Sequence, residues 1–144
     1  MKKPLCVMAL VCIGILLVSC GSNRLGDPKA QLMRDFGLHI DKKDCVLEEL
    51  FNNYEGLPYE GIALYKLTVG EDVRQAFLQW ERFPLPEAAE NFLESLSAYV
   101  ELPLIADGYW KMVDRNPGTS AYTNVSLCVY DRATDAAYLL TMDI

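Results

Sequence analysis

The chain has 144 residues, of which 51% are hydrophobic, and its 20 acidic residues outnumber its 13 Lys and Arg to give a formal net charge of −7. This negative charge repels nucleic-acid phosphates and anionic lipid headgroups, which argues against nucleic-acid binding and against a basic membrane-binding surface. A chain of this length holds one domain with a hydrophobic core of its own.

Residues 1–19 have the pattern of an export signal. Lys2 and Lys3 form a short cationic start, and the 14 residues from Leu5 to Val18 are all apolar or small. A membrane-spanning helix needs about 20 apolar residues, so this run is short for a span and matches a signal-peptide core. Its removal would take away two lysines and no acid, and would change the formal charge from −7 to −9.

The apolar run ends in Leu17-Val18-Ser19-Cys20-Gly21, which resembles the lipobox of bacterial lipoproteins. The resemblance implies that the Cys20 thiol carries diacylglycerol and that a signal peptidase cuts before it. The chain would then be anchored to a membrane on the extracytoplasmic side of the cell envelope. Gly21 favours the outer membrane if the source has two membranes. The alternatives are an ordinary signal peptide and a short uncleaved anchor.

Residues 20–26 are mostly small or polar, and we interpret them as a tether. We expect residues 27–144 to form a single globular domain. Asp27 followed by Pro28 is typical of a helix start, because an aspartate side chain can cap the first turn and proline fits there. Gly37 is typical of a helix end, so a short helix is predicted between these signals.

The next segments favour strands. Leu38 to Ile40 alternates between apolar and polar residues and predicts a short strand, and Val46 to Tyr54 is ambiguous but favours a strand. Residues 52–61 are interpreted as a turn region. The run from Ile62 to Val69 is rich in branched and aromatic residues and predicts a strand.

The centre of the chain predicts two helices, and the last third predicts three strands. Apolar residues recur at helical spacing from Val73 to Trp80 and again from Ala89 to Val100, with Pro103 beyond them. Strands are predicted at residues 109–115, 123–130 and 137–144. Because the helices are clustered, we predict an α+β fold, with a mostly antiparallel sheet of about four to six strands and two or three helices packed on one face.

Two cysteines remain in the predicted domain. In an oxidising compartment Cys45 and Cys128 could form a disulfide, which would stabilise the fold by about 4 kcal/mol in the chain-entropy view. The alternative is two buried free thiols that behave as small hydrophobic side chains. The sequence leaves both alternatives open.

The sequence provides little support for catalysis or for a metal or cofactor site. His39 is the only histidine, and no Cys-x-x-Cys or His-x-x-x-His spacing is present. No nucleophile motif or phosphate-binding glycine loop is present either. Three acidic pairs remain as enzymatic candidates: Glu48/Glu49, Glu55/Glu60 and Asp131/Asp135. We predict no cofactor and no enzymatic activity.

Aromatic residues are the candidate contacts for a ligand or a protein partner. Tyr-Glu-Gly occurs twice between residues 54 and 61, and tyrosines on a loop can stack on a sugar or anchor an interface. We therefore consider Tyr54, Tyr59 and Trp110. The alternative is a hairpin connection with aromatic side chains packed against the sheet.

These observations lead to a hypothesis about function. We expect a membrane-anchored lipoprotein that works as an interaction or binding module in the envelope, with another envelope protein or a glycan as partner. One alternative is an inhibitor or immunity-type protein that blocks a basic envelope enzyme, since an acidic surface accelerates association with basic partners. A carboxylate-dependent hydrolase is a second alternative.

Overall fold

The computed structural model describes residues 27–40, 45–54, 60–118 and 122–144. The predicted signal peptide, Cys20 and the tether lie outside these residues. The described chain forms three helices and six strands: α1 (Pro28–Phe36), β1 (Cys45–Asn52), β2 (Gly61–Val69), α2 (Glu71–Phe77), β3 (Glu81–Arg82), α3 (Glu87–Ser95), β4 (Gly108–Asp114), β5 (Asn124–Asp131) and β6 (Ala136–Asp143).

The six strands form one sheet in the order β1-β2-β6-β5-β4-β3, and every neighbouring pair is antiparallel. This arrangement confirms the predicted α+β class. The C-terminal strand β6 lies between β2 and β5, and seven of its eight residues are buried. A strand that is covered on both faces reads as a continuous apolar run, as the sequence of β6 does from Ala136 to Leu140.

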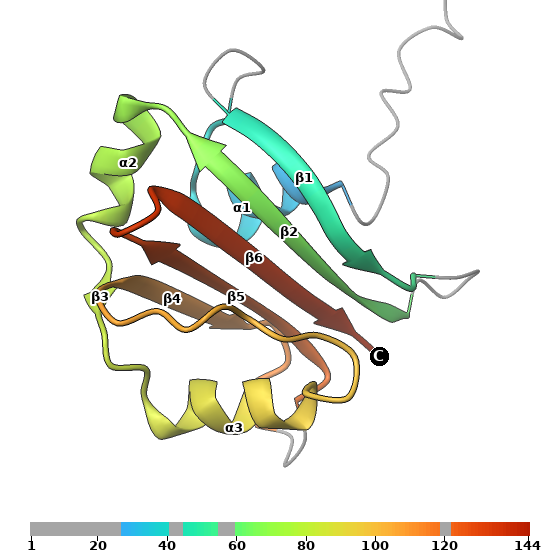
Figure 1. Cartoon of the computed structure of the whole chain (residues 1–144). Coiled ribbons are helices and arrows are strands. Elements are labelled where there is room, and N and C mark those ends of the chain that lie inside the picture. The colour runs from blue at the N-terminus through green and yellow to red at the C-terminus, as the bar shows by residue number, and fades with distance from the viewer. Residues whose placement is uncertain (1–26, 41–44, 55–59, 119–121) are drawn as a thin grey trace, which may run out of the picture.

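The sheet has a hydrophobic core on each face. On one face, α1 and α2 pack against β2, β5 and β6 through side chains such as Leu32 and Phe77. On the other face, α3 packs through Phe92 and Ala89. Figure 1 shows α3 and α1 on opposite sides of the sheet. The prediction that the helices share one face therefore holds for α1 and α2 but is wrong for α3, because both faces of β6 are apolar and need cover.

The predicted signals for α1 are confirmed. Asp27 Oδ1 accepts a hydrogen bond from the backbone N–H of Lys29 at 3.0 Å, and Gly37 ends the helix with a left-handed backbone, φ 70°. The strand predicted at residues 38–40 does not form. The N–H of Leu38 instead bonds the carbonyl of Leu32 at 3.2 Å, and Leu38 is buried, as is usual for the residue that closes this type of helix end.

The two central helices are shorter than their apolar patterns. Trp80 lies beyond the end of α2 but packs on Phe77 with a ring separation of 4.8 Å. Val100 lies beyond the end of α3 but belongs to the hydrophobic core that α3 covers. A turn after each helix keeps these side chains on the same face as the helix. The apolar spacing in the sequence therefore continues past the last helical residue. The two-residue strand β3 was not predicted, since two residues carry no periodicity.

Candidate functional site

The segment that joins α3 to β4 crosses the face of the sheet that α3 covers (Figure 1). We call its residues 101–105 the strap. They form neither helix nor strand, and the side chain of Leu104 is 99% exposed. Pro103 removes one backbone N–H and fixes φ, which keeps this stretch out of regular structure.

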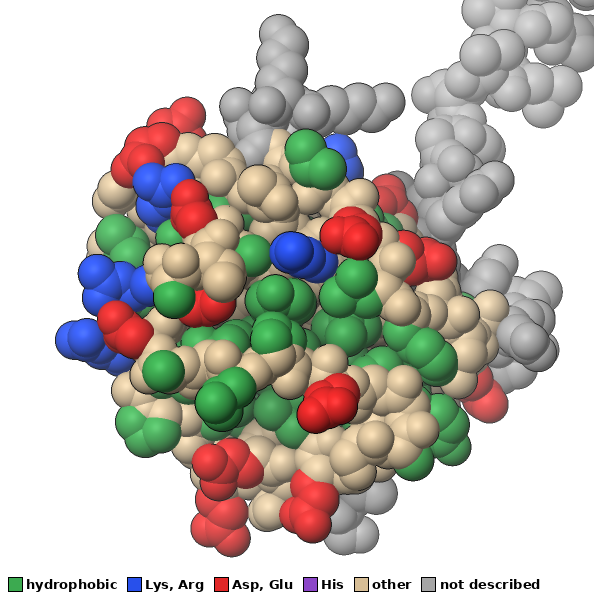
Figure 2. All heavy atoms as spheres, viewed as in Figure 1, with side chains coloured by type: hydrophobic (Ala, Val, Ile, Leu, Met, Phe, Trp, Pro, Cys, Tyr) green, Lys and Arg blue, Asp and Glu red, His purple; other side chains and the backbone are tan. Residues whose placement is uncertain are grey.

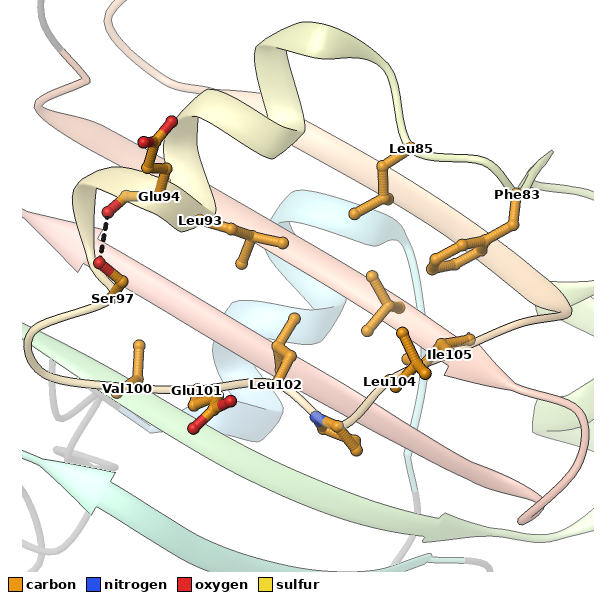
Figure 3. Close-up of a pocket in the computed structure, with 12 residues that line it drawn as sticks. Phe83, Leu85, Leu93, Glu94, Ser97, Val100, Glu101, Leu102, Leu104 and Ile105 are labelled. Atoms are coloured by element: carbon orange, nitrogen blue, oxygen red, sulfur yellow. Dashed lines mark hydrogen bonds between the residues drawn. The ribbon is translucent and has the colours of Figure 1, made fainter.

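An apolar groove lies between α3 and the strap (Figure 3). Its volume is about 470 Å³, and Val129 of β5 is part of its lining. Leu93 enters from α3, Leu102 enters from the strap, and Phe83 closes one end. The complete lining is Phe83, Leu85, Leu93, Glu94, Ser97, Val100, Glu101, Leu102, Pro103, Leu104, Ile105 and Val129.

The polar residues of this groove lie near the end of α3. Ser97 Oγ donates to the backbone carbonyl of Glu94 at 2.8 Å, which fixes the serine hydroxyl (Figure 3). The side chains of Glu94 and Glu101 are exposed, and within the described ranges neither carboxylate forms an ion pair or a hydrogen bond. The groove is thus an apolar hollow with two acidic residues at its edge.

A second hollow of about 460 Å³ lies on the other side of the strap and shares residues 101–104 with the groove. Leu50 of β1, Lys66 of β2 and Tyr138 of β6 line it, together with Glu48. Val46 is 71% exposed on the same face, since side chains two residues apart in a strand point to the same side and Val46 stands two residues before Glu48. We call the groove, the strap and the second hollow the strap surface. Figure 2 shows hydrophobic side chains gathered across this face with acidic ones around them.

The aromatic candidates from the sequence do not line this surface. The hydroxyl of Tyr54 donates to Asp143 Oδ2 at 2.8 Å and is 3.2 Å from Thr141 Oγ1, so its tip is held against β6. Burial is the largest cause that raises the pKa of Tyr54. Tyr54 therefore anchors the chain next to β1, and the packed aromatic alternative fits this position better than a free contact on a loop. Tyr59 lies outside the described residues.

Trp110 lies on β4 and faces the same core as α3. It is partly buried, and its indole Nε1 is buried without a hydrogen-bond partner among the described residues. It does not line the groove. The packed aromatic alternative fits this position better than a ligand contact.

The two domain cysteines are buried free thiols. Their strands β1 and β5 have β2 and β6 between them, which separates the backbones by roughly 14 Å at ~4.8 Å per strand. A disulfide needs Cα atoms within about 7 Å, so Cys45 and Cys128 do not pair in this fold. Burial raises the pKa of both thiols, which keeps them protonated and unreactive.

The acidic pairs from the sequence have structural roles or lie apart. Asp131 accepts hydrogen bonds from the Ala133 N–H and the Thr134 hydroxyl, and so shapes the turn before β6. Asp135 accepts from Arg74 and from the hydroxyl of Tyr130. Glu48 and Glu49 are both exposed on β1 beside an irregularity in register, and Glu55 is outside the described residues.

A polar cluster on the opposite face of the sheet was not predicted from the sequence. Asp35 of α1 accepts from Ser126 Oγ, from Arg115 Nη1 and from Gln31 Nε2 at 2.7–2.8 Å, and Arg115 also pairs with Asp143. Burial raises the pKa of Asp35, but hydrogen bonds from Arg34 and Ser126 and the charge of Arg115 outweigh it, and the net pKa is below the ordinary value. Arg115 and Ser126 are 80 and 91 residues from Asp35 in sequence, so no local motif could reveal these two partners.

Across the described ranges no cluster of three His, Cys, Asp or Glu side chains is arranged to hold a metal ion. No helix among those residues is both long enough and apolar enough to cross a membrane. Searches against protein families, curated proteins and solved structures find no significant match to this chain. The case for the strap surface as the candidate site therefore rests on its shape and on its lining residues.

Proposed function

We propose that this protein is a bacterial lipoprotein, anchored to an envelope membrane through Cys20, that binds another envelope molecule through the strap surface. The observation that carries the binding role is the strap itself. Leu104 is 99% exposed on a ridge between two hollows that share its walls. Soluble monomers rarely leave large contiguous apolar surfaces, and such surfaces commonly mark interaction sites.

The position of α1 supports this arrangement. The helix begins at Pro28, eight residues after Cys20, so the intervening chain can span at most about 29 Å. α1 packs on the face of the sheet opposite to the strap surface. A tether that enters the fold at α1 would leave the strap surface on the far side of the sheet, open to a partner.

Fatty-acid labelling tests the anchor. Cells that express the full chain are grown with an alkyne fatty acid, and the purified protein is examined for label. We expect label on the wild type and on Cys6→Ser, and none on Cys20→Ser. Label that persists in Cys20→Ser would refute lipidation at this residue without affecting the binding proposal.

Site-specific photocrosslinking in the source cell tests the binding surface. A photoreactive amino acid replaces Leu104 on the strap or, as a matched control, Met33 of α1, which is also exposed but lies on the opposite face. We expect a discrete adduct from position 104 and none of the same mass from position 33. Equal adducts from both positions, or none from position 104, would contradict the strap surface as the binding site. A glycan partner would give an adduct that is sensitive to glycan-cleaving enzymes.

An inhibitor or immunity-type role is the second candidate. The observation that favours it is the pair of acidic side chains at the groove, Glu94 and Glu101, on a chain with net charge −7. Such a protein would suppress the activity of a basic envelope enzyme, and rising salt would weaken the inhibition. Binding without inhibition would favour the general binding module. No contact among the described residues favours the hydrolase alternative.

A further inference from the structure

We infer that the strap surface takes a cationic amphipathic segment of another protein, with its apolar side chains on both sides of Leu104 and its basic side chains near Glu94 and Glu101. This inference rests on the proposed function and names the chemistry of the partner. It follows from the shape of the surface and from the charges at its edge.

The shape indicates a partner larger than a small molecule. The groove alone, at about 470 Å³, has the size of an ordinary ligand pocket. The second hollow continues the surface across the strap to Leu50 on β1, where apolar side chains lie beside the charged Glu48 and Lys66. An occupant that covers both hollows and Leu104 must place apolar groups on each side of a ridge, which an amphipathic segment of a protein can do.

The charges indicate a basic partner. Glu94 and Glu101 lie at the groove with exposed carboxylates, and neither has an ionic partner in the described part of the chain. Among the described residues, Lys66 is the one basic residue that lines either hollow, and Glu48 is its cross-strand neighbour. Basic side chains of a partner would be attracted to this excess of acidic residues at the rim. The same charge complementarity would make binding specific and would fix the orientation of the partner.

The same charges argue against two other occupants. In a symmetric pair of copies the same patch meets itself, which would bring two acidic rims together on chains that each carry a charge of −7. An anionic membrane surface would be repelled by Glu94 and Glu101 in the same way. A cationic segment satisfies both the apolar hollows and the acidic edge.

Peptide binding to the full chain tests the inference. The protein is held in nanodiscs of phosphatidylcholine, a zwitterionic lipid, and empty nanodiscs serve as the blank. The probes are three labelled synthetic peptides of about 16 residues. The first has leucines along one helical face and lysines beside them, the second has glutamate in place of lysine, and the third has the composition of the first with its leucines dispersed. Binding is measured by fluorescence anisotropy at about 50 mM and about 300 mM salt.

We expect the first peptide to bind more tightly than the other two by about tenfold or more, and to lose affinity as salt rises. The double variant Glu94→Gln/Glu101→Gln should weaken its binding by about tenfold. Glu87→Gln/Glu90→Gln is the matched control on the same helix, since these exposed acids do not line the groove. It removes the same charge and should change affinity less than about twofold. Leu104→Ser should weaken binding without reducing its salt dependence.

The outcomes separate the two proposals. If the glutamate peptide binds as well as the lysine peptide, or if both double variants behave alike, the cationic partner is refuted. The strap surface survives that result if Leu104→Ser still weakens binding. If Leu104→Ser has no effect on any peptide, or if no peptide binds, both the inference and the binding role of the strap surface fail. Self-association that Leu104→Ser abolishes would assign the surface to a second copy and overturn the inference.

Discussion

Arg115 and Asp35 are 80 residues apart in sequence, yet Nη1 of the arginine donates to Oδ2 of the aspartate at 2.7 Å. The aspartate side chain is 2% exposed and the arginine side chain 19%. Arg115 follows β4 and also pairs with Asp143 at the end of β6. A single guanidinium therefore joins α1, the first element of the described fold, to two strands from its C-terminal third.

Removal of Arg115 tests this link. Arg115→Met should lower the free energy of unfolding by about 2–3 kcal/mol, because it removes the more buried of the two cationic partners of the Asp35 carboxylate and leaves only the exposed Arg34. The measurement is urea denaturation followed by circular dichroism. Arg132→Met is the matched control, since Arg132 pairs with Asp107 but both side chains are nearly half exposed. The control should lose less than about 1 kcal/mol. Equal losses in the two variants would contradict a special role for Arg115.

The stability of the fold should fall in acid. The pKa of Asp35 is lowered in the folded protein, where Arg34, Ser126 and Arg115 overcome the effect of burial. The pKa of Asp135 is also lowered, first by the hydrogen bond from Tyr130 and then by Arg74. A lowered folded pKa contributes stability that is fully present above the unfolded value of about 3.9 and is lost as pH falls through the folded pKa.

Urea midpoints measured between pH 7 and pH 2 check this dependence. We expect a plateau down to about pH 4 and a decline below it. The decline should be shallower in Asp35→Asn, which has one fewer shifted carboxyl to protonate. A wild-type midpoint that stays constant to pH 2 would show that these carboxyls do not have lowered pKa values.

The free thiols predict that reductant has no effect on stability. Cys45 and Cys128 are buried and separated by two strands, so the melting temperature should be the same within about 1 °C with and without reductant. A thiol reagent at neutral pH should react with neither until the protein unfolds, because burial keeps both protonated. A drop of several degrees on reduction would instead reveal a disulfide and a different strand arrangement.

The exposed Leu104 should contribute little to folding. Leu104→Ser should change the free energy of unfolding by less than about 0.5 kcal/mol, because its side chain is already in water. Leu96→Ala is the comparison, since Leu96 is buried in the core beneath α3, and it should lose about 2–4 kcal/mol. Urea denaturation of both variants measures these two changes in the free energy of unfolding. A large loss in Leu104→Ser would mean that the strap is needed for the fold and would weaken its assignment to a partner.

Local chemistry in the sequence was sufficient to predict much of the fold. Asp27, Pro28 and Gly37 predicted the ends of α1, and the apolar run from residue 62 to 69 predicted β2, because caps and alternation act between near neighbours. The three C-terminal strands were predicted to within one residue at each end. The clustered helices also indicated the correct α+β class.

The candidate site could not be predicted in the same way. Its lining comes from the segment before α3, from α3, from the strap and from β5, and only folding brings them together. Tyr54, one of the aromatic candidates from the sequence, is instead hydrogen-bonded to β6.

The sequence by itself determined the elements, the class of fold and the surplus of acid, because these depend on local spacing and on composition. Only the tertiary structure decided which face α3 covers, that Arg115 reaches Asp35, and that Leu104 stands exposed between two hollows. These features depend on the insertion of β6 between β2 and β5. The β2–β6 pairing joins residues that are 68 to 82 positions apart, and no local pattern specifies it.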